Sequence, residues 1–441
     1  MSDRQRDYLF FKKTVLDRIS GTFCAAKWYE VTLWLYMGAN ASCHHNPTHR
    51  NDSVDDPSLL HNTDQKISER KQMLEGERVD GCHYCWNAED SGIISDRIMK
   101  SYSYAWDDQK KNIPLKVTPK KVEVAFSRSC QLACAYCSPT FSSSWANDVT
   151  VNGSYNLVSN NRFNKDIKNK LIPDDDNKYI QAFFDWWPEL KKDLQVIRFT
   201  GGEPLLHPRF WEFLDVLHKD QDYFGDFIVN SNLIHEKGQV EKFIERTKYL
   251  TDNGKNVEIH TSCESSLAHA EYTRDGFKGK LWLKNVNDIL TNSDIKITVT
   301  TAINNMSVWS FGEYLKMISH LKGIYGKDRI STNFNRVLYP QWHSLAILPE
   351  KLRIEIADEL KLTFDNLPYL HDDQSIMPFN DLYTYLRNTK FHDPIYSEKQ
   401  VLTDAVSFYD QFNKRRNKDI SVLDPRYVNW IEQTRLELNN E

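Results

Sequence analysis

The stretch VEVAFSRSCQLACAYC, residues 122–137, joins a short apolar segment to three closely spaced cysteines. The apolar residues of Val122–Phe126 favour a buried β-strand. Cys130, Cys134 and Cys137 follow this strand with the spacing C-x3-C-x2-C. Three thiolates on one tight loop are suited to bind three irons of a [4Fe–4S] cluster and to leave its fourth iron open. Three packed cysteines, or a zinc site completed by a distant histidine, are the alternatives.

A second strand pattern, Val196–Thr200, runs directly into a glycine-rich turn. Two glycines allow the backbone to approach a ligand closely, and the carboxylate of Glu203 is suited to accept a hydrogen bond from an ammonium group. Alone, this turn is a weak signal, because ordinary strand-to-helix turns often contain glycine. The turn consists of Gly201, Gly202, Glu203 and Pro204.

Short strands alternate with amphipathic stretches through the middle of the chain, which predicts a parallel sheet with right-handed crossovers. Six such units are too few for a closed eight-stranded barrel. We therefore expect an α/β fold, an open partial (β/α)6 TIM-like barrel, with functional groups at the C-terminal ends of its strands. The strand candidates are Val122–Phe126, Val196–Thr200, Asp226–Asn230, Val257–Thr261, Ile295–Thr301 and Ile330–Asn335.

The cysteine triad after the first strand and Gly-Gly-Glu-Pro after the second together resemble the radical S-adenosylmethionine (radical SAM) superfamily, over about residues 122–336. The resemblance implies that Cys130, Cys134 and Cys137 hold a catalytic [4Fe–4S] cluster. The open iron of that cluster would bind the amino and carboxylate groups of S-adenosylmethionine. An electron would then cleave the sulfonium, and the resulting 5′-deoxyadenosyl radical would abstract hydrogen from a substrate.

The resemblance also implies further contacts to the cofactor. It puts Tyr136 against the adenine, and it puts Arg274 at the methionyl carboxylate, where a guanidinium suits a bidentate contact. Asn230 and Ser231 end the third strand, where the family has polar contacts to the ribose. Ser262 stands where peptide-modifying members have the serine of Ser-x-Asp. For Tyr136 the alternative is a core position, and for the others it is a solvated loop residue.

Four more cysteines precede this region, and they are Cys24, Cys43, Cys82 and Cys85. The first two form C-x13-G-x4-C through Gly38, across a hairpin predicted from the alternating pattern of Trp28–Met37. The last two add C-x2-C. This arrangement resembles the twitch or SPASM auxiliary-cluster module of peptide-maturing radical enzymes. It departs from them in one respect, because here the module precedes the barrel.

Four thiolates are suited to bind either an auxiliary [4Fe–4S] cluster or a structural zinc ion, and the spacing alone does not separate the two. Unligated thiols are a third alternative. Four histidines lie close enough in sequence to replace one thiolate, and they are His44, His45, His49 and His83. Cys263 is outside both sets and is expected to be a small buried hydrophobe.

The chain has 441 residues, eight cysteines and a formal net charge of −5. This charge gives no global field for capturing nucleic acid, which is therefore not expected as a partner. No apolar run reaches the ~18 residues of a membrane span, and no signal-peptide pattern follows Met1, so no membrane partner is expected. Clustered cysteines without a secretory signal indicate metal ligation in a reducing compartment, and we predict a cytoplasmic location.

Three domains are expected from these patterns: an auxiliary metal-binding module over 1–115, the barrel over 116–345 and a helical extension over 346–441. One polar insertion interrupts the barrel, because 21 of the 41 residues from 138 to 178 are Ser, Thr, Asn or Asp. Such a stretch is usually a functional lid or a disordered segment. Phe141–Trp145, directly after the triad, is a candidate for part of a lid.

The leading functional expectation is a radical SAM enzyme that modifies a peptide or protein, because the enzymes it most resembles act on peptides. An electron donor such as flavodoxin or ferredoxin would supply the reducing electron. Two alternatives stay open at this point. One is a radical SAM enzyme that acts on a small molecule or nucleotide, and the other is a non-catalytic iron–sulfur protein.

Overall fold

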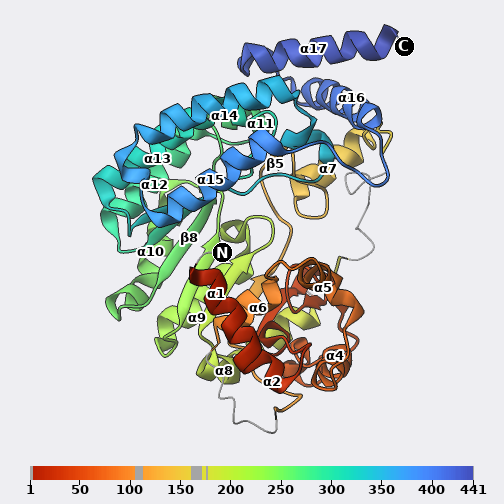
Figure 1. Ribbon diagram of the computed structural model, residues 1–441. Coiled ribbons are helices and arrows are strands. Elements are labelled where there is room, and N and C mark those ends of the chain that lie inside the picture. Colours follow the sequence, from red (N-terminus) through yellow and green to blue (C-terminus); the bar gives the residue numbers. More distant parts are fainter. Residues whose placement is uncertain (1–2, 105–112, 160–170, 175–176, 441) are drawn as a thin grey trace. The chain divides into compact units, whose positions relative to one another are not determined.

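The computed structural model describes residues 3–104, 113–159, 171–174 and 177–440 (Figure 1). Contacts divide the chain into two compact units, and each unit contains parallel strands and covering helices. The α/β class is therefore confirmed, whereas the size of the barrel and the domain boundaries at 115 and 345 stay predictions. The first unit comprises Met1–Ser127, Lys170–Gly201 and Asp220–Phe227, and the second comprises Arg128–Asn169, Gly202–Lys219 and Ile228–Glu441.

The first unit is built on five strands in the order β6-β4-β1-β2-β3. β4 pairs in parallel with both β6 and β1, so that Val124 lies opposite Phe199 on one side and Leu33 on the other. All three side chains are fully buried. The strands are β1 (Glu30–Trp34), β2 (Ala39–Ala41), β3 (His49–Arg50), β4 (Lys121–Ala125) and β6 (Val196–Thr200). The helices are α1 (Asp3–Phe11), α2 (Asp17–Ile19), α3 (Ala25–Tyr29), α4 (Asp64–Leu74), α5 (His83–Asp90), α6 (Asp96–Tyr102) and α8 (Lys178–Asp193).

The predicted hairpin around Gly38 is present, with different bounds from those expected. β1 pairs antiparallel with β2, and Gly38 turns the chain between them in the left-handed region, at φ 61°. The strand begins only at Glu30, because Trp28 belongs to the short helix α3. The alternation in the sequence therefore located the hairpin but extended its first strand too far.

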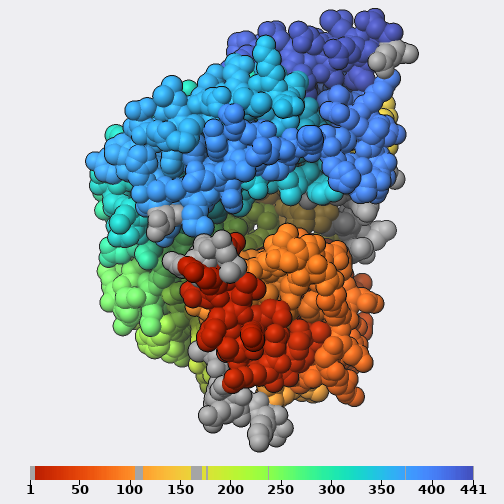
Figure 2. All heavy atoms as spheres, viewed as in Figure 1, coloured from red at the N-terminus to blue at the C-terminus, as the bar shows by residue number. Residues whose placement is uncertain are grey.

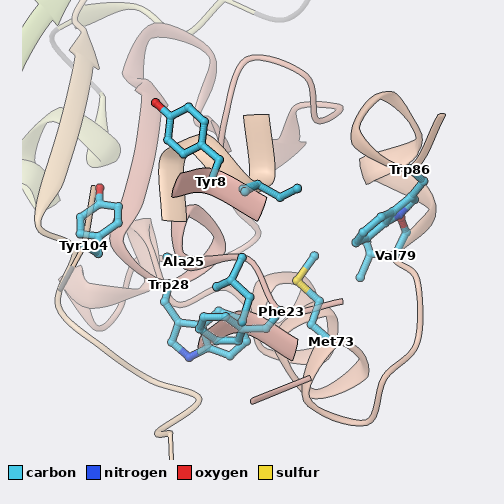
Figure 3. Close-up of a cluster of buried hydrophobic side chains, with 10 residues drawn as sticks. Tyr8, Phe23, Ala25, Trp28, Met73, Val79, Trp86 and Tyr104 are labelled. Carbon is cyan, nitrogen blue, oxygen red and sulfur yellow. The ribbon is translucent and has the colours of Figure 1, made fainter. Parts of the chain in front are cut away.

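A cluster of buried aromatic and aliphatic side chains forms a core of the first unit (Figure 3). The rings of Phe23 and Trp28 lie 4.6 Å apart, and Met73 is fully buried in the same cluster. Two of the module cysteines, Cys24 and Cys82, pack against this cluster. The core therefore supports the loops that carry those thiols.

In the second unit, β8 pairs in parallel with β10, and β10 pairs in parallel with β11. Val257 and Ile259 are buried on one face of β8, whereas His260, which follows Ile259 along the strand, is half-buried. The strands are β5 (Ala133–Cys134), β8 (Val257–Ser262), β9 (Arg274–Asp275), β10 (Lys296–Thr300) and β11 (Ile330–Asn333). β7 (Asp226–Asn230) and α9 (Pro208–Asp220) contain residues of both units. All six predicted strands are thus present, within two residues of their expected ends.

Helices cover the strands of the second unit and make up its C-terminal part, as expected from the sequence. α13, α14 and α15 pack side by side (Figure 1). The C-terminal residues, in blue, form a continuous layer of atoms on the face shown in Figure 2. The helices are α7 (Ser143–Asn152), α10 (Lys237–Asp252), α11 (Leu267–Thr273), α12 (Gly279–Asn292), α13 (Phe311–Tyr325), α14 (Glu350–Asp365), α15 (Asp373–Asn388), α16 (Glu398–Arg416) and α17 (Pro425–Asn440).

The polar insertion over 138–178 is not structureless, because its first part forms α7. Ser142 caps this helix through a hydrogen bond from Trp145 N to its hydroxyl oxygen. Residues 160–170 and 175–176 of the insertion lie outside the described residues. Among the helices that the structure describes, none has the length and apolar character needed to cross a membrane.

Candidate functional site

The cysteine triad lies on a loop of the second unit that includes the short strand β5. β5 pairs antiparallel with β9, and Cys134 lies opposite Arg274 in this pair. Cys134 is buried, whereas Cys130 and Cys137 are half-buried. The pairing therefore anchors the middle cysteine and leaves the outer two partly accessible.

Side chains from the start of α7 hold the backbone of this loop. The hydroxyl of Ser144 donates to Cys130 O at 2.7 Å. The indole nitrogen of Trp145 donates to Cys134 O at 2.8 Å, and its ring is fully buried. The expectation of a lid over 141–145 is therefore wrong for Trp145, since its ring is part of the core that supports the triad.

The two glycines of the Gly-Gly-Glu-Pro turn pack closely against the backbone that precedes the triad. Within the first unit, a Cβ on Gly201 would lie 2.4 Å from Ser127 O, and the glycine has φ +113°. Within the second unit, a Cβ on Gly202 would lie 2.3 Å from Ser129 O. A side chain fits at neither position. The glycines thus allow the backbone to approach another part of the chain closely. The sequence had suggested that they allow it to approach a ligand.

Glu203 is buried and already has several hydrogen-bond partners. Its Oε1 accepts from the Ser231 hydroxyl at 2.8 Å, and its Oε2 accepts from Asn232 N at 2.6 Å. His235 Nε2 lies 3.0 Å from Oε1. A carboxylate offers about four acceptor positions, so Oε2 keeps capacity for one more donor. These contacts fix the carboxylate in one orientation.

Asn232 connects this carboxylate to the first cysteine. Its amide nitrogen lies 4.0 Å from Cys130 Sγ and 3.2 Å from Gln131 Oε1. In return, Gln131 Nε2 donates to Asn232 Oδ1 at 3.1 Å. The functional reading of the sequence did not include Gln131 or His235. No motif marks either residue, and their relevance comes only from the fold.

Tyr136, Glu264 and Arg274 form a polar network next to Cys134, in which Glu264 and Arg274 are buried and Tyr136 is half-buried. The Tyr136 hydroxyl donates to Glu264 Oε1 at 2.8 Å, and Arg274 Nη1 lies 3.4 Å from Glu264 Oε2. Arg274 also donates to the Tyr136 hydroxyl. All three side chains are therefore held by one another, and they come from two segments more than 100 residues apart in sequence.

Burial dominates the ionisation of these groups. It raises the pKa of the Glu264 carboxyl above its ordinary value, although Arg274 partly opposes this shift. Burial likewise raises the pKa of the Cys134 thiol to about 12, and Arg274 again acts in the opposite direction. Iron binds the thiolate, so occupation of this loop by a cluster requires loss of the thiol protons.

The remaining expected cofactor residues lie at or near the ends of strands. Asn230 and Ser262 are the last residues of β7 and β8, and both are half-buried. Pro204 is buried and begins a short 3-10 turn. Ser231 is buried and bound to Glu203, as described above. The second unit therefore brings Glu203, Ser231 and Cys130 into one network, through Asn232.

One feature of Arg274 fits an anionic ligand. Its Nε is buried and has no hydrogen-bond partner among the described residues. An unpaired buried N–H of a charged group is costly, whereas a carboxylate would satisfy it in the planar geometry that a guanidinium prefers. The residues present thus suit the carboxylate that the family resemblance implies.

All four N-terminal cysteines line one pocket of the first unit. Cys24 immediately precedes α3, Cys43 follows β2, and Cys82 and Cys85 lie at the start of α5. These segments are distant in sequence, and the core described above holds two of them. The thiols therefore surround a space instead of packing as ordinary hydrophobic side chains.

The pocket also contains charged and amide groups suited to compensate thiolate charge. Lys27 and Arg97 line it and are both almost fully buried. When the Asn46 amide is oriented so that its nitrogen donates to Gly81 O, that nitrogen also faces the thiols of Cys43 and Cys82. Such donors stabilise negatively charged sulfur ligands.

Burial favours the protonated form of three of these thiols, those of Cys24, Cys82 and Cys85. It raises the pKa of Cys82 to about 12 and that of Cys85 to about 11, and the nearby cysteines add to both shifts. Burial also raises the pKa of Cys24. Any metal bound here would thus displace protons from the thiols.

Of the four histidines near these cysteines, His45 lines the pocket. Its ring stacks on Tyr84 at 3.7 Å, and its Nε2 lies 2.7 Å from Asp96 Oδ2. His44 and His49 face Glu123 and Glu69 instead. His83 is exposed.

Among the residues that the structure describes, no three His, Cys, Asp or Glu side chains form a group for a single metal ion. A [4Fe–4S] cluster does not require thiols that converge on a single ion, because its thiolates bind separate irons and surround a larger space. Comparison with known proteins adds no family assignment: no protein-family model matches the chain, and no curated protein is significantly similar to it.

Proposed function

We propose that the chain is a radical SAM enzyme, with Cys130, Cys134 and Cys137 as the ligands of a catalytic [4Fe–4S] cluster. The observation that carries the proposal is the surroundings of the triad. Arg274, with a buried unpaired Nε, lies opposite Cys134, and Glu203 is joined to Cys130 through Asn232. A basic group and an acidic group flanking three thiols suit the carboxylate and the ammonium of an amino acid moiety.

Several residues would bind S-adenosylmethionine in this proposal. Arg274 would donate to the methionyl carboxylate, and the free capacity of Glu203 Oε2 would accept from the amino group. Asn230, at the end of β7, would contact the ribose, and Ser262 would contribute from the end of β8. When bound, the cluster and S-adenosylmethionine supply an electron and a 5′-deoxyadenosyl radical that abstracts a hydrogen atom from the substrate.

Two roles are proposed for Tyr136, one for its ring and one for its hydroxyl. Its ring would contact the adenine, while its hydroxyl links Glu264 to Arg274 and so keeps the guanidinium in place. Burial of Glu264 and Arg274 keeps water away from their contact, which strengthens the polar interactions between them.

For the substrate we propose a peptide or protein, with an electron donor such as flavodoxin or ferredoxin and a cytoplasmic location. The pocket of Cys24, Cys43, Cys82 and Cys85 supports this class, since four thiols around one space suit an auxiliary [4Fe–4S] cluster. Zinc at the same four thiols is the competing occupant. A partial (β/α)6 barrel is the proposed architecture around the cysteine triad, and the four N-terminal cysteines belong to a separate module that precedes it in the sequence.

The test measures iron, sulfide and zinc per chain after anaerobic reconstitution, for the wild type and for Cys130→Ala/Cys134→Ala/Cys137→Ala. Two four-iron clusters would give about eight irons in the wild type and about four in the triple variant. Cys263→Ser, which alters the cysteine outside both sets, is the matched control and should retain the wild-type iron content.

Each alternative gives a different metal content. About four irons with one zinc in the wild type, and zinc alone in the triple variant, would make the N-terminal site structural and remove the main support for a peptide substrate. Equal iron in the wild type and the triple variant would refute the catalytic cluster. Bound iron without 5′-deoxyadenosine formation under reducing conditions would favour a non-catalytic iron–sulfur protein.

A further inference from the structure

His343 connects the cysteine loop to the C-terminal helical segment. The residue ends a short 3-10 turn and is fully buried. Its Nε2 lies 3.1 Å from Ala135 O, and its Nδ1 lies 3.1 Å from the hydroxyl of Tyr409. A carbonyl only accepts hydrogen bonds, so Nε2 carries the hydrogen, and Nδ1 of the neutral ring is left as an acceptor.

Tyr409 lies on α16 and is itself held firmly. Its hydroxyl is 3.0 Å from Asn305 Oδ1 and 3.1 Å from Trp342 O, and its ring is completely buried. The one hydroxyl hydrogen is shared among these acceptors and His343 Nδ1. Because the hydroxyl has so little freedom, it fixes the plane of the imidazole.

A second connection from α16 reaches the same loop. Arg416 lies over the Trp145 ring at 4.5 Å and donates to the Tyr155 hydroxyl at 2.7 Å. Phe412, also on α16, packs on the same indole. Trp145 in turn donates to Cys134 O. In Figure 1, α7 and α16 are neighbours, as these contacts require.

Two consecutive carbonyls between the second and third cysteines are therefore held by side chains that rest on α16. Cys134 O accepts from Trp145, and Ala135 O accepts from His343. In a trans peptide the N–H lies in the same plane as the carbonyl and points the opposite way. Fixing Ala135 O thus also fixes the direction of the Tyr136 N–H, within the stretch that separates Cys134 from Cys137.

We propose that His343 is a positioning residue for the cysteine loop and that Tyr409 orients it, which makes the C-terminal segment part of the cluster site. This inference rests on the proposed function. Hydrogen bonds near cluster sulfurs set the reduction potential, and the spacing of the thiols sets access to the open iron. Loss of the His343 contact should change both properties without removing a ligand.

The test compares His343→Ala, His343→Gln and Tyr409→Phe in the full chain. We measure iron per chain, the electron paramagnetic resonance spectrum of the reduced cluster with and without S-adenosylmethionine, and its midpoint potential. The part of the spectrum that responds to S-adenosylmethionine reports on the triad, because a fully ligated cluster has no open iron. Tyr369→Phe, an exposed tyrosine, is the control.

We expect His343→Ala to retain iron but to bind S-adenosylmethionine roughly tenfold more weakly, the effect of about one lost hydrogen bond. Its spectrum and midpoint potential should shift. His343→Gln should bring the spectrum and the midpoint potential close to their wild-type values, because its side-chain amide can still donate to Ala135 O. Tyr409→Phe should shift them less than His343→Ala, since it removes only the group that orients the imidazole.

The inference would be overturned if an iron-loaded His343→Ala protein kept the wild-type spectrum, the wild-type midpoint potential and the wild-type affinity for S-adenosylmethionine. If His343→Ala fails to fold, Tyr409→Phe decides, and a wild-type spectrum in that variant overturns it equally. An identical loss in His343→Gln and His343→Ala would indicate a packing role only. Absence of iron at the triad in the wild type would instead refute the proposed function, which is a distinguishable result.

Discussion

Arg274 and Cys134 lie opposite each other in a two-stranded antiparallel pair, which puts a buried guanidinium next to the middle thiol of the cysteine loop. The same guanidinium contacts Glu264 and the Tyr136 hydroxyl. Its positive charge lowers the pKa of Cys134 against the larger, opposite effect of burial. Arg274 thus serves both the stability of the site and the charge balance of its thiols.

Removal of this guanidinium should therefore destabilise the fold. Arg274→Met leaves Glu264 buried and without its cation, which is expected to cost about 3 kcal/mol of unfolding free energy. Combining it with Glu264→Gln should recover part of that loss, because the neutral amide can still accept from Tyr136. Urea unfolding followed by circular dichroism measures both effects.

The control for this prediction is an exposed ion pair in the same unit. Arg209 and Glu212 lie 2.7 Å apart on α9, with 37% and 48% of their side-chain surfaces exposed. Surface pairs contribute little, so Arg209→Met should change the unfolding free energy by less than about 1 kcal/mol. Equal effects of Arg274→Met and Arg209→Met would show that the buried pair does not stabilise the second unit.

The second glycine of the turn offers a test of how tightly the triad loop is packed. In Gly202→Ala the new Cβ would lie 2.3 Å from Ser129 O, so the backbone next to Cys130 must move. Overpacking of this kind costs about 1–3 kcal/mol, and we expect less iron at the triad. Gly21→Ala, where nothing lies within 4 Å, is the control. Full iron content in Gly202→Ala would contradict the prediction.

The strands could be predicted from the sequence because each is a short apolar run followed by a polar turn. Val196–Thr200 and Asp226–Asn230 match their predicted bounds, since the period-two pattern and the flanking turn residues agree at both ends. Trp28 was assigned to a strand because its neighbours alternate, yet tertiary packing places it in α3. The helix α7 was missed because six of its ten residues are Ser, Thr, Asn or Asp, which favour turns and caps in isolation.

The site could be predicted only where the chemistry lies on one short segment. C-x3-C-x2-C and the glycine turn are local, so their spacing carries information by itself. Gln131, His235 and His343 depend on contacts between segments far apart in sequence, and nothing in their local sequence distinguishes them. The role proposed for α16 could not be predicted from the sequence either. Its link to the loop depends on long-range contacts of Trp145 and Tyr409.

A buried histidine in the first unit predicts a pH dependence of stability. His61 is fully buried, with Lys66 Nζ 2.9 Å from Nδ1 and Arg70 Nη2 2.7 Å from Nε2, and burial together with these cations lowers its pKa well below its ordinary value. Below about pH 6.5 the unfolded chain binds a proton here that the folded chain does not, so stability should fall by up to about 1.4 kcal/mol per pH unit. Urea unfolding between pH 7.5 and 5.5 measures this slope, which His61→Gln should reduce and the exposed control His320→Gln should leave unchanged. Identical slopes in the wild type and His61→Gln would show that His61 does not contribute.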